Sequence, residues 1–278
     1  MVTERIAESV YLFTSEEYAQ VNAGAVIGPE WTVLIDTLAT PQETRQIREF
    51  VERRLNSRVR YLVNTHYHAD HTIGNYLFPE ATIVAHARCR ELMDTRGRAA
   101  LDKGREANRE LRDVEVVLPQ AVFDEGEISL RVGRRILQLL RLPGHSQDGI
   151  GVLILEDRVL FAGDAMMPIP YLVDGDFEDQ VESLKRFPRL KLENLIQGHG
   201  EVILRGEILN AVRSNLTYLS HMARLVRRAG KRKSAAEYLS EIDIEACGKS
   251  RILLNGLAAD LHARNVQALY QLWFGRRK

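Results

Sequence analysis

The sequence lacks the features that would assign it to several common protein classes. It has only two cysteines, Cys89 and Cys247, whose wide separation offers neither a disulfide framework nor a zinc knuckle. It has no apolar run near the roughly 20 residues needed to cross a bilayer. The N-terminus, MVTERIAESVYLF, lacks the basic and long apolar segments of a secretion signal. We therefore expect a cytoplasmic protein without a membrane-spanning segment.

The chain also lacks net charge, because 38 Lys and Arg balance 38 Asp and Glu. This balance gives no indication of a dedicated nucleic-acid or membrane binder. The signs are unevenly distributed, since the chain from Ile203 onward has 14 Lys and Arg against 6 Asp and Glu. This asymmetry indicates either a basic appendage with its own role or a solvated helical face.

Short apolar segments rich in β-branched residues predict two groups of strands. The first group covers residues 10–13, 21–27, 31–35, 59–63 and 82–85. The second covers residues 128–132, 135–140, 151–155, 158–161 and 195–197. Helical spacing predicts helices after Pro41 and over residues 73–77, 88–112 and 177–186. This arrangement indicates an α/β or α+β sandwich.

Beyond Arg205 the pattern becomes wholly helical. Apolar residues recur at spacings of three and four in Leu209, Val212, Leu216 and Leu219. An amphipathic helix of this kind needs a partner surface, because alone it would be marginally stable. We therefore predict a sandwich domain over residues 1–204 and a helical extension over residues 205–278. The extension should pack beside the functional site and contribute to substrate binding, to a homodimer, or to both.

A cluster of metal-ligand residue types follows the predicted strand at 59–63. His66, His68, Asp70 and His71 lie within six residues. In an extended segment, positions i and i+2 point to the same side, so His66 and His68 can bind one metal together. A turn after Ala69 can then direct Asp70 and His71 toward a second metal. Imidazole and carboxylate are ligands that zinc, iron and manganese accept, whereas the alternative is a loop with surface histidines.

Three further polar residues follow predicted strands of the second group. His145 lies in Leu-Pro-Gly-His-Ser, Asp164 in Phe-Ala-Gly-Asp and His199 in Gln-Gly-His-Gly. Each stands at a strand end that leads into a glycine-bearing loop, where a rigid sheet can orient a ligand. Considered alone, each would more often be structural, but the HxHxDH cluster favours a functional role for all three.

The motifs HxHxDH, PGHS, AGD and GHG, in this order, resemble those of the metallo-β-lactamase superfamily. The segments VNAGAVI and VLIDT resemble the first strands of the same family, and the resemblance covers about residues 5–204. It implies an α/β fold, an αββα sandwich, with metal ions at one edge of two packed sheets. The C-terminal helical extension lies outside it.

The resemblance also implies a role for each ligand. One metal would be held by His66, His68 and His145, a second by Asp70, His71 and His199, with Asp164 bridging the two. The site would hold two divalent ions that share a bridging hydroxide as the nucleophile. Zinc is the expected metal, and iron and manganese are the alternatives. Asp164 and Asp70 would thus be catalytic, Asp70 by orienting the nucleophile.

Within the superfamily, this ligand set resembles glyoxalase II, the lactone hydrolases and the tRNA-processing nucleases. Lactamases with Cys in place of Asp164, and flavodiiron proteins with Glu in place of His68, are less similar. The resemblance therefore implies a hydrolase of a small-molecule ester, thioester or lactone. Alternatives are a phosphodiesterase or nuclease, a mononuclear iron dioxygenase and a non-catalytic binding module. The chain has no obvious long insertion for gripping RNA, so we do not expect a nucleic-acid partner.

Several other residues are candidates for supporting roles. Asp36 ends a predicted strand and is a candidate for holding a metal-bound histidine by its second ring nitrogen, or for a purely structural role. Tyr67, Met166 and Tyr171 are candidates for substrate contacts. His86 could be an extra ligand, although all the ligand roles are already filled.

A basic cluster spans residues 224–233 and has two interpretations. Cations suit a helix C-terminus, and Gly230 fits as the end of that helix. Alternatively, Arg224, Arg227 and Arg228 recognise an anionic group of the substrate. In glyoxalase II, which this chain resembles, basic residues of a helical C-terminal region bind a carboxylate, but they have no residue-by-residue match in this sequence, so the first interpretation is favoured.

Overall fold

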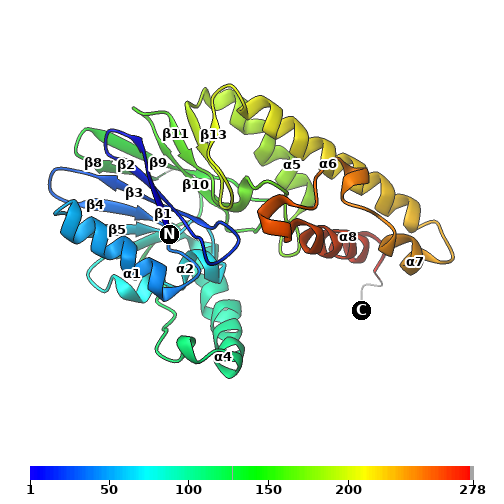
Figure 1. The fold of residues 1–278 in the computed structure, drawn as a ribbon, viewed down its shortest axis with the longest axis horizontal. Coiled ribbons are helices and arrows are strands. Elements are labelled where there is room, and N and C mark those ends of the chain that lie inside the picture. Colours follow the sequence, from blue (N-terminus) through cyan, green and yellow to red (C-terminus); the bar gives the residue numbers. More distant parts are fainter. Residues whose placement is uncertain (127, 276–278) are drawn as a thin grey trace.

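The computed structural model describes residues 1–126 and 128–275 and contains two β-sheets (Figure 1). The first sheet has the order β1-β2-β3-β4-β5-β6-β7 and the second the order β13-β12-β11-β10-β9-β8. The strands of the first sheet are β1 (Val2–Ala7), β2 (Val10–Thr14), β3 (Asn22–Ile27), β4 (Thr32–Ile35), β5 (Val59–Val63), β6 (Thr82–His86) and β7 (Ala121–Phe123). Those of the second are β8 (Ile128–Val132), β9 (Arg135–Arg141), β10 (Ile150–Ile154), β11 (Val159–Phe161), β12 (Asn194–Ile196) and β13 (Ile203–Leu204).

The two sheets pack face to face around a common apolar core. Val33 and Val63 of the first sheet belong to the same buried cluster as Val152 and Phe161 of the second. The approach is close at Gly24, where an added Cβ would lie 2.2 Å from the Phe161 ring. A glycine there lets the sheets pack closely.

Helices cover the outer face of each sheet. On the first sheet, α1 (Pro41–Glu49), continued by the π-helical turn η1 (Phe50–Arg54), buries Ile47 and Val51 against Leu34 and Leu62. On the second, α5 (Phe177–Arg186) and α6 (Ile208–Ala229) share a core cluster with strand residues such as Leu160. The αββα sandwich expected from the sequence is therefore confirmed.

The parallel strand pairs determine where the functional loops meet. β4 and β5 run parallel with Ile35 opposite Val63, and β11 and β12 run parallel with Phe161 opposite Ile196. The carboxyl ends of parallel neighbours lie at the same edge of a sheet. The segments that follow these four strands are thereby brought to one edge of the sandwich.

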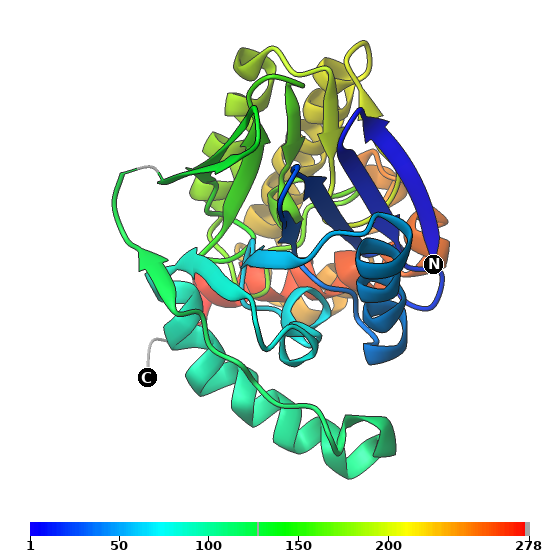
Figure 2. The ribbon, with the colours of Figure 1, turned by 90° about the vertical axis from the view of Figure 1, so that its left-hand side faces the viewer.

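The remaining helices form two additions to the sandwich. The first comprises α3 (Ala87–Leu92), η3 (Met93–Gly97), α4 (Arg98–Ala107) and η4 (Arg109–Leu111), a helical arm that projects away from the sheets (Figure 2). The second comprises α7 (Ala235–Ser240), η7 (Glu245–Cys247), η8 (Leu253–Gly256) and α8 (Ala258–Phe274); α7, η7 and α8 pack with α6, and η8 packs with α8. The short helices α2 (Ala69–Thr72), η2 (Asn75–Leu77), η5 (Gly163–Ala165) and η6 (Phe187–Leu190) lie in connecting segments. Within residues 1–126 and 128–275, none of the helices has the length and apolar character to span a bilayer.

Several local features differ from the sequence-based expectation. β1, β7 and β13 were not predicted, because β1 is a largely exposed edge strand without apolar alternation and the other two have only three and two residues. In place of the helix expected over residues 73–77, the structure has a turn followed by the 3-10 helix η2 at Asn75–Leu77, and a separate short helix, α2, precedes them at Ala69–Thr72. His68 is extended, with φ −61° and ψ 145°, so the chain enters the helix directly after it.

Candidate metal centre

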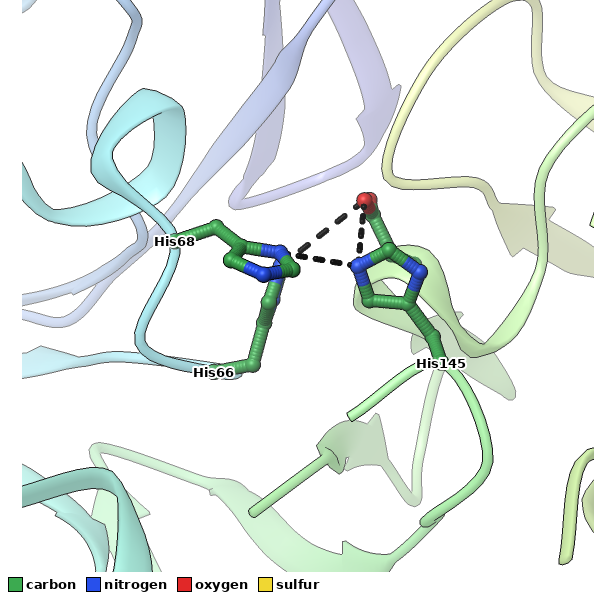
Figure 3. A group of neighbouring side chains, drawn as sticks. His66, His68 and His145 are labelled. Atoms are coloured by element: carbon green, nitrogen blue, oxygen red, sulfur yellow. Dashed lines mark hydrogen bonds and ion pairs between the residues drawn. The ribbon is translucent and has the colours of Figure 1, made fainter. Parts of the chain in front are cut away.

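The structure brings all of the predicted ligands together at this edge of the sandwich. The potential ligand atoms form two groups, and within each group they lie within 4.8 Å of one another. The first group is His66, His68, His145 and Asp164, whose histidines converge in Figure 3. The second group is Asp70, His71 and His199.

The first motif follows β5 and uses two backbone conformations. The extended segment that ends at His68 directs His66 and His68 to the first group, as the i, i+2 spacing predicts. The chain then turns into α2, which carries Asp70 and His71 toward the second group. One motif therefore serves both groups.

Asp164 lies between the two groups. Its Oδ2 is 3.2 Å from His145 Nε2 and 3.5 Å from His199 Nε2, while its Oδ1 is 3.2 Å from His71 Nε2. The Asp164 carboxylate can occupy this place only because residue 198, directly before His199, is a glycine: a Cβ added at Gly198 would lie 1.8 Å from Asp164 Oδ1. The carboxylate thus has an oxygen toward each group, as a bridging ligand requires.

A chain of hydrogen bonds through Asp36 orients two of the histidines. Asp36 accepts hydrogen bonds from the backbone N–H of Thr65 at 2.7 Å, from the Thr65 hydroxyl at 2.6 Å and from His71 Nδ1 at 3.0 Å. Because the Thr65 hydroxyl has given its only hydrogen to Asp36, it accepts from His66 Nδ1, 3.1 Å away. Nδ1 of both His66 and His71 is therefore protonated, and Nε2 of each is left to face the ligand groups.

Each of the other three histidines also has a hydrogen-bond partner on the ring nitrogen that faces away from the ligand groups. His145 Nδ1 donates to the Tyr171 carbonyl at 2.8 Å, and His199 Nδ1 donates to the Ala19 carbonyl at 2.9 Å. His68 is turned around, since its Nε2 lies 3.2 Å from Asp174 Oδ2 and its Nδ1 faces His145. Partners of this kind are typical of metal-bound histidines, because they fix the tautomer and orient the ring.

The centre contains buried polar atoms that a cation would satisfy. Among the described residues, His66 Nε2, His71 Nε2 and Asp164 Oδ1 make no hydrogen bond, although the last two atoms face each other at 3.2 Å. Leaving a buried polar group unsatisfied costs about 1–3 kcal/mol. Five imidazoles and two carboxylates form a donor set suited to zinc, iron or manganese. The residues present therefore fit divalent metal ions.

The electrostatics of the two groups differ. Burial lowers the pKa of His66 well below its ordinary value and that of His145 to about 4, so both rings are neutral and able to bind metal. Burial would also lower the pKa of His199, but Asp164 and Asp70 outweigh it and raise that pKa to about 10. A metal ion in the second group would therefore displace a proton from His199.

An open cavity of about 570 Å³ gives access to the ligands. The candidate substrate residues Tyr67 and Tyr171 both line it. The prediction that Met166 contacts the substrate is not supported. This side chain is 1% exposed in the core beneath α6, and its neighbour Met167 lines the cavity instead. Met166 has an extended backbone, with φ −127° and ψ 123°, in which successive side chains point to opposite sides.

The helical extension contributes to the cavity wall. Leu254 of η8, Leu261 of α8 and Leu257 between the two helices line it together with Tyr18. Asn265 of α8 holds the loop opposite, accepting from Leu172 N at 2.8 Å and donating to the Pro170 carbonyl at 2.7 Å. The extension therefore packs beside the site as predicted, and its role in a homodimer stays a prediction.

The basic cluster lies elsewhere. Arg224, Arg227, Arg228 and Lys231 line a separate groove of about 640 Å³ between α5 and α6. Arg227 stacks over the Trp273 ring, with its guanidinium carbon 4.7 Å from the ring centroid. In the described part of the chain, none of these cations lines the cavity above the ligands. A direct contact with a substrate group bound there is therefore not supported.

Asp174 is a site residue that the sequence-based analysis missed. Besides His68, it accepts hydrogen bonds from the Tyr67 hydroxyl at 2.9 Å and from Arg96 Nη1 at 3.3 Å. The hydrogen bond from His68 is the largest cause that lowers the pKa of Asp174, to about 2. Burial raises the pKa of Tyr67 to about 12, so its phenol remains a donor. No motif marks Asp174, because its partners lie about a hundred residues away in the sequence.

His86, the candidate for an extra metal ligand, contacts residues outside both ligand groups. Its Nε2 lies 3.0 Å from the Asp124 carbonyl oxygen and contacts Arg141, and it belongs to neither ligand group. The less favoured interpretation as an extra ligand is therefore not supported.

Comparison with known proteins agrees with this geometry. The family model of the metallo-beta-lactamase superfamily matches residues 18–199. A Beta-lactamase-like protein 2 homolog of Caenorhabditis elegans is 25% identical over 215 residues, covering 76% of this chain and 65% of that protein. A probable metallo-hydrolase of Methanocaldococcus jannaschii is 25% identical over 191 residues, 65% of this chain and 88% of that protein. The Homo sapiens Acyl-coenzyme A thioesterase MBLAC2 is 26% identical over 211 residues, 65% of this chain and 73% of that protein. The first of these relatives thus has about a third of its length outside the match.

Solved structures show the same fold. A metallo-beta-lactamase from Pontibacter korlensis superposes with a TM-score of 0.62 at 18% identity, over 76% of this chain and 97% of that one. The stereoselective inverting sec-alkylsulfatase Pisa1 from Pseudomonas sp. superposes with a TM-score of 0.75 at 14% identity, over 99% of this chain and 50% of that one. The names of the relatives and the ligand groups support the predicted class of enzyme, a metal-dependent hydrolase.

Proposed function

Because the chain belongs to the metallo-beta-lactamase superfamily, we propose that it is a dinuclear hydrolase of acyl thioesters, with carboxylic esters and lactones as related substrates. The observation that carries this proposal is the pair of adjacent ligand groups, with Asp164 between them, at an open cavity. The choice of a thioester is supported by the similarity to proteins named acyl-coenzyme A thioesterases.

In this proposal each ligand group would hold one divalent ion, for which zinc is the first candidate, and Asp164 would contribute to both groups. When bound, the ions would supply an acidified water at neutral pH and polarise the carbonyl of the substrate. The protein residues would do the positioning. Asp36 and Asp174 would keep His71 and His68 in the tautomer and orientation that binding requires.

Asp70 would orient the attacking water. Its Oδ2 lies 3.4 Å from His199 Nε2, and its side chain is 22% exposed, so the carboxylate borders the cavity. A carboxylate is an acceptor only, which suits it to take a hydrogen bond from water. Burial and the nearby Asp70 raise the pKa of Tyr18, so its phenol at the cavity wall remains protonated and can donate to a substrate oxygen.

A metal analysis and a substrate panel test the proposal. The metal-replete protein should contain two metal ions per chain. In a panel of an acyl thioester, a carboxylic ester, a lactone, a phosphodiester and a sec-alkyl sulfate, the thioester should have the highest kcat/KM. Chelation should abolish turnover, and added zinc should restore it. One iron per chain with oxygen uptake would instead indicate a dioxygenase, and a phosphodiester preference would indicate a nuclease-type enzyme.

Asp164→Ala provides the matched test of the bridging role. We expect turnover to fall to background while the melting temperature stays close to that of the wild type, because the site lies at the edge of the sandwich. Asp179→Ala, at an exposed position in the first turn of α5, is the control. Full turnover by Asp164→Ala with two metal ions bound would exclude a bridging carboxylate.

A further inference from the structure

A second, smaller cavity adjoins the one above the ligands. It has a volume of about 100 Å³ and lies under the helical arm. Tyr67, Ala69, Gly97 and Ala100 line both cavities. Tyr67 and Ala69 also alternate with the ligands His68 and Asp70 along the chain. The smaller cavity, called here the side pocket, therefore opens beside the ligand groups.

The walls of the side pocket are largely apolar. They include Ile73, Met93, Leu101, Leu111, Val114 and Val116. Met93 and Val114 are buried, at 2% and 1% exposure, so this part of the wall is firmly packed. The charged residue on the wall is Glu115, which is exposed. Contact between such a surface and an apolar group is favourable, whereas a polar group would find few hydrogen-bond partners there.

The helical arm leaves its own apolar side uncovered at this pocket. None of the ten residues of α4, all of them described, is buried, although the helix is amphipathic. Its Leu101 is half-buried and faces the pocket. An amphipathic helix normally buries its apolar face against a partner. Gly97, which lines both cavities, has no side chain, and a Cβ added there would meet only Leu92 and Met93 of the arm itself, at 3.8 Å.

We propose that the side pocket binds the acyl chain of the substrate, while the thioester carbonyl lies at the ligand groups. This inference rests on the proposed function and names its substrate class, a short acyl thioester. The occupant is indicated by the continuity with the catalytic cavity, by the apolar walls and by the size. A water molecule takes up about 30 Å³ of liquid volume, and a methylene group is of similar size, so 100 Å³ accommodates about three groups. An acyl chain of about five carbons would place its last three methyl or methylene groups in the pocket.

A chain-length series tests the inference. Acyl thioesters of one thiol, from acetyl to decanoyl, are compared on the metal-loaded wild type. Each buried methylene contributes about 0.8 kcal/mol, a factor of about four. We therefore expect kcat/KM to rise about fourfold per carbon from acetyl to pentanoyl, and to level off or fall for longer chains.

Two variants connect this preference to the pocket. Ala100→Phe adds a ring where the two cavities meet and should lower the pentanoyl-to-acetyl ratio of kcat/KM at least about tenfold. Leu101→Ala enlarges the pocket and should move the optimum toward longer chains. The matched control is Ala99→Phe, which places the same ring on a neighbouring exposed residue that lines neither cavity, and should leave the ratio unchanged.

The outcomes separate the two proposals. If the wild type hydrolyses thioesters but Ala100→Phe keeps the wild-type ratio, or Ala99→Phe lowers it equally, the acyl chain binds elsewhere and the inference is wrong. The proposed function would then still stand. If the metal-loaded wild type hydrolyses no thioester of any length, the proposed function fails and the acyl pocket with it.

Discussion

Asp36→Asn is the most informative perturbation of the metal centre away from the ligands themselves. The carboxylate accepts three hydrogen bonds, one at Oδ1 from Thr65 N and two at Oδ2 from the Thr65 hydroxyl and His71 Nδ1. An amide of the same shape has one accepting oxygen and one donating nitrogen. The variant therefore changes hydrogen bonding with almost no change in volume.

The amide cannot satisfy all three donors. If its oxygen stays opposite Thr65 N, its NH₂ group faces His71 Nδ1, which must then accept. The imidazole proton moves to Nε2, the atom 3.2 Å from Asp164 Oδ1 that would bind metal. If the amide is reversed, its NH₂ group meets the backbone N–H of Thr65. Either arrangement weakens the second ligand group.

Loss of such a supporting partner typically costs 10–100-fold in metal affinity, or about 1.4–2.7 kcal/mol. We expect that loss for one of the two metal ions, with a smaller effect on the other through Thr65 and His66. Competition with a chromogenic chelator measures both affinities. Asp179→Asn, an isosteric change on the exposed surface of α5, is the control. Wild-type affinity for both ions in a folded Asp36→Asn protein would refute the tautomer argument.

Three further predictions concern other parts of the molecule. Gly198→Ala should lose metal and turnover, because its Cβ would lie 1.8 Å from Asp164 Oδ1; Gly206→Ala, with no described atom within 4 Å of the new Cβ, should match the wild type in both. Burial lowers the pKa of Lys249 from 10.5 to about 8, so the unfolded chain binds more protons between these pH values and the wild type gains stability as the pH rises through this window. Lys249→Met should remove that slope in denaturant titrations and stabilise the protein at pH 7 by about 1 kcal/mol, less than the full shift implies because Lys249 is only half-buried. Neutralising the arginines of the α5–α6 groove together should change KM and kcat for the thioester less than about twofold, and a KM that rises at low salt but not at high salt would restore the substrate contact proposed from the sequence. The residues concerned are Arg224, Arg227 and Arg228.

The sequence by itself indicated the sandwich and singled out the residues that the structure brings together as two candidate ligand groups. Both are encoded locally: apolar segments mark the strands, and the polar residues that follow β5, β11 and β12 mark the sheet edge where ligands collect. The spacing of His66 and His68 determines their common direction in an extended segment. Asp36 could be proposed for the same reason, since it follows β4, the parallel neighbour of β5.

The tertiary structure alone decided which residues surround the ligands. Asp174 contacts His68 across 106 positions of the sequence, and Leu254, Leu257 and Leu261 reach the cavity from the C-terminal helices. The side pocket likewise exists only because the helical arm packs beside α2. Such contacts depend on how helices and loops are oriented against the sheets, and a rotation of about 100° per helical residue changes which side chain faces the site. Local sequence patterns specify the elements, but the packing between distant elements determines which side chains complete the cavity.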